Sequence, residues 1–88
     1  MHNYKFIVTG KVQGVYYRKT ICENAQKIDV SGYVKNLEDR SVEVCATLED
    51  DDFGLFIELL ERGSKASHVE DIKQTLIDTV FSGTFEVR

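Results

Sequence analysis

The chain has 88 residues, of which 42% are hydrophobic and 30% charged, and its formal net charge is −4. This length supports one hydrophobic core, so we expect a single domain over residues 1–88. The acidic balance argues against an extended nucleic-acid surface, which needs clustered cations, but it leaves room for one small anion in a local positive pocket. No apolar run approaches the ~20 residues that span a membrane, and the first residues lack the basic-then-apolar layout of a signal peptide. We therefore expect a cytoplasmic protein that binds neither nucleic acid nor membrane.

Seven elements are expected from the hydrophobic periodicity. In chain order they are a strand over 4–12, a helix over 18–28, strands over 30–37 and 42–49, a helix that opens with the acidic residues 49–52 and ends at Gly63, and strands over 69–78 and 83–87. Each helix has apolar residues on one side only, which predicts that both cover one face of an antiparallel sheet. The order β-α-β-β-α-β with a short terminal strand is that of a split βαβ sandwich, an α+β fold.

The inward positions of the two helices follow from the same pattern. They are Ile21, Ala25 and Ile28 with Cys22 beside them in the first helix, and Phe53, Phe56, Ile57 and Leu60 in the second.

Cysteine and histidine usage predicts neither a disulfide nor a metal site. Cys22 and Cys45 are the only cysteines, and without a targeting segment they are expected to be free thiols. Cys45 is out of phase with the apolar residues of its strand, so it is expected to face away from Cys22. His2 and His68 are isolated, and neither C-x-x-C nor H-x-x-x-H spacing occurs.

The run from Gly10 to Arg18, Gly-Lys-Val-Gln-Gly-Val-Tyr-Tyr-Arg, carries the strongest functional signal. Its glycines allow a turn between a strand and a helix, and such a junction directs backbone N–H groups and the positive end of a helix dipole at one spot. Arg18 adds a planar cation that matches phosphate oxygens. The candidate phosphate ligands beside Arg18 are the backbone N–H groups of Gln13, Gly14, Val15, Tyr16 and Tyr17. The two tyrosine side chains are expected to pack rather than to contact a substrate.

Asn36 is the second candidate site residue. In a βαβ unit the ends of the first two strands lie at the same edge of the sheet, which brings Asn36 near the loop, although Asn is also a common turn residue. Its amide is suited to hold a water molecule in line with a bound phosphorus. The loop offers no nucleophile, general acid or magnesium-binding carboxylate, so an ordinary phosphate ester is a poor substrate. A mixed anhydride releases a carboxylate that needs no protonation, and the residues therefore favour an acyl phosphate.

Both motifs resemble those of the acylphosphatase family. Residues 10–18 match its G-x-V-Q-G-V-x-[FY]-R signature and residues 32–36 match G-x-V-x-N, at the family's separation, and the resemblance covers almost the whole chain. It implies a ferredoxin-like sandwich that hydrolyses acyl phosphates to a carboxylate and phosphate without a cofactor. It also implies that Arg18 binds the phosphate, that Asn36 orients the water, and that residues 13–17 form a cradle that inorganic phosphate or sulfate can occupy.

Two departures from the family pattern affect loops. Arg40 stands in the hairpin after Asn36 where the family usually has Gly, and holding a non-Gly residue at positive φ costs ~1 kcal/mol or more. A changed turn is therefore expected there. The segment Gly63-Ser64 lacks the proline that the family often has.

Three other functions share this fold. A non-catalytic module that binds an anion or an acyl phosphate has the same loop. Single-stranded RNA binding needs exposed aromatics and a positive face, whereas the strand over 42–48 has no aromatic residue. A domain of a larger carbamoyl-phosphate-handling maturation protein is less expected, because the chain begins at Met1 and has its own final strand. The absence of heptads and of a large apolar stripe favours a monomer.

Overall fold

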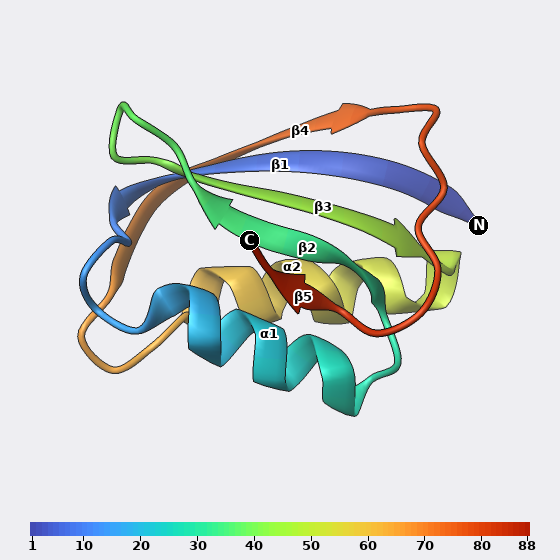
Figure 1. Ribbon diagram of the computed structural model, residues 1–88, viewed down its shortest axis with the longest axis horizontal. Helices are drawn as coiled ribbons and strands as arrows, with labels where there is room; N and C mark the ends of the chain where they lie inside the picture. Colours follow the sequence, from blue (N-terminus) through green and yellow to red (C-terminus); the bar gives the residue numbers. More distant parts are fainter.

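The computed structural model describes all of residues 1–88 and has two layers, a sheet and two helices that cover one of its faces (Figure 1). The elements are β1 (His2–Lys11), α1 (Tyr17–Lys27), β2 (Ser31–Asn36), β3 (Val42–Leu48), the 3-10 turn η1 (Asp50–Asp52), α2 (Phe53–Arg62), β4 (His68–Leu76) and β5 (Glu86–Val87). The expected order is confirmed. The expected bounds of β1, α1, β2, β3 and β4 are off by at most two residues. The acidic residues expected to open the second helix form η1 instead, so α2 begins only at Phe53 and has no acidic residue in its first turn. The last strand is confined to two residues.

The strands lie side by side in the order β4-β1-β3-β2-β5. β3 pairs antiparallel with both β1 and β2, so β1 and β2 run in the same direction and their C-terminal ends lie on the same side of the molecule. β5 is parallel to β2, so the sheet is mixed rather than wholly antiparallel. After β4 the chain crosses to the opposite edge of the sheet, where it reaches β5 running in the direction of β2 (Figure 1).

The core lies between the sheet and the helices. Ile21 and Ala25 of α1 and Phe56 and Leu60 of α2 are fully buried there, as the periodicity predicted, while Ile28, Phe53 and Ile57 are partly buried. Two loop residues, Val15 and Phe85, also belong to this core, and helical or strand periodicity does not identify them. Neither helix is long and apolar enough to cross a membrane.

Gly10 and Gly32 lie within strands, where each allows the neighbouring strand to approach closely. Neither forms a turn. Gly10 lies within β1 at an irregularity of the β1–β4 pairing, where an added Cβ would clash with the carbonyl of His68. Gly32 has a φ of 150°, and an added Cβ would clash with the carbonyl of Cys45 in β3. Of the two glycines expected to turn the chain before α1, only Gly14 lies in the turn itself.

The hairpin between β2 and β3 keeps Arg40 at a φ of 75°, so the expectation of a changed turn is wrong. The hairpin's own hydrogen bonds impose this conformation. Arg40 N–H donates to Leu37 O at 3.2 Å, and Leu37 N–H donates to Ser41 O at 2.9 Å. The Asp39 carboxylate accepts from the Ser41 hydroxyl at 2.5 Å and from its N–H at 3.0 Å, and these bonds hold the pKa of Asp39 below its usual range.

Replacing Arg40 with glycine is expected to stabilise the protein. Glycine adopts positive φ without a steric cost, so we expect Arg40→Gly to raise the free energy of unfolding by about 0.5–1 kcal/mol. Arg40→Ala retains the Cβ and should change it little. Thermal unfolding of the two variants measures the difference, and a glycine variant less stable than the alanine variant would contradict the steric argument.

The two cysteines are free, buried and on opposite sides of the sheet. The Cys22 thiol of α1 donates to Phe85 O at 3.4 Å, whereas the Cys45 thiol donates to the Tyr33 hydroxyl at 3.3 Å on the face away from the helices. Burial raises the pKa of both thiols. The predictions that they are unpaired and face apart are confirmed.

Both thiols are therefore expected to react slowly in the folded protein. A raised pKa lowers the thiolate fraction at any given pH, and the thiolate is the nucleophile. At pH 8, alkylation by iodoacetamide should be at least about tenfold slower in the native protein than in urea, where both groups are exposed. Mass spectrometry of timed samples gives both rates, and equal rates would show that the thiols are accessible.

Candidate active site

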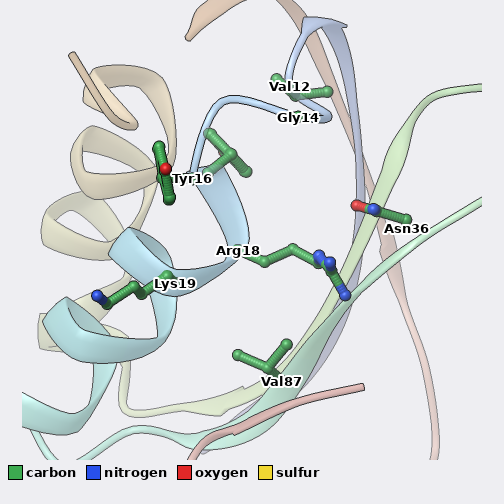
Figure 2. A pocket seen from close by; sticks show the side chains of 8 residues that line it. Val12, Gly14, Tyr16, Arg18, Lys19, Asn36 and Val87 are labelled. Atoms are coloured by element: carbon green, nitrogen blue, oxygen red, sulfur yellow. The ribbon is translucent and has the colours of Figure 1, made fainter. Parts of the chain in front are cut away.

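A cavity of about 430 Å³ opens where β1 and β2 end. It lies between the loop that precedes α1, the end of β2 and the last strand (Figure 2). The residues that line it are Val12, Gly14, Tyr16, Tyr17, Arg18, Lys19, Asn36 and Val87. The cavity thus joins the two sequence motifs at one place.

Two left-handed residues turn the chain from β1 into α1. Gly14 has a φ of 71° and Tyr16, the residue that precedes α1, has a φ of 62°. The N–H groups of residues 13–19 make no hydrogen bond within the protein, and the first bond of the helix runs from Thr20 N–H to Tyr16 O at 3.1 Å. No side chain caps α1, and its first turn carries no acidic residue. The positive end of the helix is therefore free to bind an anion at the cavity.

Side chains from the second half of the chain hold this loop. The Ser64 hydroxyl, just after α2, donates to Val15 O at 2.5 Å. The buried Tyr17 hydroxyl donates to Leu60 O at 2.8 Å, and Leu60 is in the last turn of α2, where carbonyls lack helical partners. These bonds use the Val15 carbonyl and the Tyr17 hydroxyl. The N–H groups of the loop stay unbonded.

Arg18 is the second residue of α1 and extends toward Asn36, whereas Lys19 points away from both (Figure 2). The Arg18 Nη1 donates to the carbonyl of Arg88 at 3.1 Å, and this bond connects α1 to the last residue of the chain. A guanidinium has five N–H donors, so this contact leaves donors for a bound anion. Asn36 is the last residue of β2 and is exposed at the cavity.

The structure brings most of the predicted site residues together. Gly14, Tyr17, Arg18 and Asn36 line one cavity, and Tyr17 also packs in the core as expected. The packing prediction for Tyr16 is wrong, because the residue is 78% exposed. The left-handed backbone places this side chain on the surface.

Two residues predicted as phosphate ligands do not line the cavity. Val15 is buried in the core, and the Gln13 side chain donates to Leu37 O and Ser41 O in the hairpin. Their N–H groups nevertheless remain unbonded. Sequence reasoning missed Val12, Lys19 and Val87 as cavity residues, although Val12 belongs to the motif. Lys19 directly follows the motif, but no sequence signal could have placed Val87, since its position depends on the pairing of β5 with β2.

The charged groups around the cavity favour an anion. The Arg18 guanidinium lines the cavity and extends toward Asn36, and no carboxylate lines it; the Lys19 side chain points away from both. Free backbone N–H groups and a guanidinium together match a group with several acceptor oxygens, such as a phosphoryl group.

The acylphosphatase family model matches residues 4–87. The chain belongs to the acylphosphatase family. It is 41% identical over 81 residues to an acylphosphatase of Haloarcula marismortui, a match that covers 92% of this chain and 89% of the relative. Its structure matches a crystal structure of acylphosphatase from Bacillus subtilis with a TM-score of 0.92 at 34% identity, covering 100% and 99% of the two chains. These matches confirm the ferredoxin-like α+β fold.

One further match involves a larger protein. The fold of this chain matches a part of HypF from T. kodakarensis with a TM-score of 0.88 at 29% identity. The match covers 100% of this chain but only 12% of that HypF chain. The same domain architecture therefore occurs within a much longer polypeptide.

Removing the Tyr17 hydroxyl is expected to destabilise the acylphosphatase fold. Tyr17→Phe leaves the Leu60 carbonyl at the end of α2 without its donor, which should cost about 1–2 kcal/mol of unfolding free energy. Tyr16→Phe is the matched control, because the Tyr16 side chain is exposed and makes no such bond. Urea unfolding compares the two, and equal stabilities would show that the Tyr17 bond contributes nothing.

Proposed function

We propose that this acylphosphatase hydrolyses the carboxyl–phosphate bond of acyl phosphates, and that Arg18, Asn36 and the loop before α1 form its active site. One observation carries the proposal: an uncapped helix N-terminus, a guanidinium and an amide surround a single cavity. The substrate is a small acyl phosphate, and the products are a carboxylate and inorganic phosphate.

The loop and Arg18 bind the phosphoryl group in this scheme. The N–H groups of residues 13–17, which are unbonded within the protein, donate to its oxygens together with the guanidinium. Such preorganised donors stabilise the charge on the phosphoryl oxygens of the transition state, and each well-placed donor contributes about 3 kcal/mol. Phosphoryl transfer depends chiefly on this positioning and charge stabilisation.

Asn36 orients the attacking water opposite the leaving carboxylate. The water oxygen forms a bond to phosphorus while the bond between phosphorus and the acyl oxygen breaks. The electron pair of the broken bond stays on the carboxylate. That carboxylate is stable without a proton, so the scheme needs no general acid. The proton lost by the water passes to phosphate or to solvent.

The proposal extends to how the enzyme works in the cell. The cavity lining offers an amide and a guanidinium but no carboxylate, which supports metal-independent hydrolysis. The buried free thiols are consistent with the reducing cytoplasm. We further propose that the enzyme acts as a monomer, which light scattering of the purified protein tests directly.

Hydrolysis of benzoyl phosphate at neutral pH with EDTA present tests the proposed residues. We expect turnover by the wild type. Arg18→Ala and Asn36→Ala should each lower kcat/KM by about 100-fold or more, because each removes a group that acts on the transition state. Arg62→Ala and Asn24→Ala are matched controls on helix surfaces away from the cavity, and both should retain wild-type activity.

The outcomes separate the competing functions. A folded wild type without turnover would contradict the enzyme, and binding of inorganic phosphate to it would then identify an anion-binding module. Turnover that survives both alanine substitutions would show that other residues perform the reaction. Turnover that EDTA abolishes would contradict metal independence alone.

A further inference from the structure

The side chain of Gln13 connects the two halves of the site. Its Nε2 donates to Leu37 O at 2.9 Å and to Ser41 O at 2.8 Å. A primary amide nitrogen has two hydrogens, so both donors are used within the protein. Gln13 lies between two cavity residues of the loop, Val12 and Gly14, and Leu37 directly follows Asn36. One partly buried amide thus links the loop to the residue that directly follows Asn36.

No strand pairing makes this connection. The pairing of β1 with β3 ends at Val8 and Val42, and the pairing of β2 with β3 ends at Asn36 and Val42. Beyond that point β1 continues beside β4 alone, and the loop diverges from the hairpin. The Gln13 side chain therefore spans a gap between two segments that the sheet itself does not hold together.

The bridge ends on carbonyls that define the hairpin. Leu37 and Ser41 close the hairpin through the bond from Leu37 N–H to Ser41 O at 2.9 Å. Because Gln13 binds both carbonyls at once, it fixes the orientation of the hairpin base as well as its distance from the loop. Asn36 is one residue from this base, so its side chain moves when the base moves.

We propose that Gln13 is a positioning residue that sets the separation between the phosphate-binding loop and Asn36. This inference rests on the proposed function, in which Asn36 orients the water. Tyr17 and Ser64 hold the loop to the end of α2 without the Gln13 amide. Loss of the bridge therefore impairs turnover through Asn36 and spares phosphate binding. A displacement of about 1 Å at a reacting group is sufficient to lower a rate by up to about 100-fold.

Gln13→Leu and Gln13→Met remove both donors without adding a charge, and the second retains an unbranched side chain of similar length. With benzoyl phosphate as substrate, each should lower kcat by about 10- to 100-fold. KM and the inhibition constant of inorganic phosphate should change less than about threefold, since the groups that bind phosphate are unchanged. The two substitutions are independent tests, so either one that folds is sufficient.

A double-mutant cycle shows whether Gln13 acts through Asn36. In an Asn36→Ala background, the Gln13 substitutions should change kcat by less than about twofold, because the residue they displace is gone. An equal loss in both backgrounds would overturn the proposal. A loss confined to KM and phosphate inhibition would overturn it too, because it would assign Gln13 to the phosphate cradle.

Gln26→Leu is the matched control. The Nε2 of Gln26, an exposed residue of α1, also donates to a backbone carbonyl, that of Phe85, at 3.1 Å. Its loss removes a bond of the same kind from α1, away from the loop–hairpin gap, and should leave kcat at the wild-type value. A similar fall in kcat for Gln26→Leu would show that any loss of stability reduces turnover.

An NMR measurement keeps this proposal separate from the proposed function. The side-chain amide signals of Asn36 report its environment whether or not the wild type hydrolyses a substrate. They should shift or broaden in Gln13→Leu and stay unchanged in Gln26→Leu. Unchanged Asn36 signals in Gln13→Leu would overturn the positioning role. A wild type without turnover, combined with shifted signals, would refute only the catalytic assignment.

Discussion

The site depends on one constraint, the left-handed turn that joins β1 to α1. Gly14 and Tyr16 take positive φ there, and the chain enters the helix with the N–H groups of residues 13–19 unbonded. Unsatisfied donors cost free energy unless water or a ligand accepts from them, and a left-handed Tyr16 costs ~1 kcal/mol more. Such local strain is typical of functional sites, where a bound group offsets it. The helix, the cation and the cavity are arranged around these donors.

The rest of the fold holds this turn from several sides. Tyr17 and Ser64 attach it to the end of α2, and Gln13 attaches it to the hairpin after Asn36. The ferredoxin-like topology makes this possible, because β1 and β2 flank β3 and end at one edge of the sheet. Rigid elements therefore present the unbonded N–H groups, Arg18 and the Asn36 amide to one cavity from separate segments, as electrostatic preorganisation requires.

Local patterns were sufficient to predict the elements, the inward faces of both helices and the loop motif. These depend on near-neighbour spacing, as for Ile21 and Ala25, and on residue type, as for Arg18. They failed at Arg40, where steric preference predicted a different turn. The hydrogen bonds of Ser41 with Leu37 and Asp39, all within the hairpin turn, outweigh that preference.

The sequence by itself determined the order of the elements, the loop motif and the two candidate side chains, because each is encoded in contiguous residues. Only the tertiary structure decided which long-range partners those residues have. The Gln13 amide contacts the hairpin, Val87 reaches the cavity through the parallel pairing of β5, and Phe85 enters the core from a loop. The physical reason is the same for all three. Each contact joins segments far apart in the chain, and no local periodicity specifies how the chain crosses from β4 to β5 or how a loop side chain spans the gap beyond a strand.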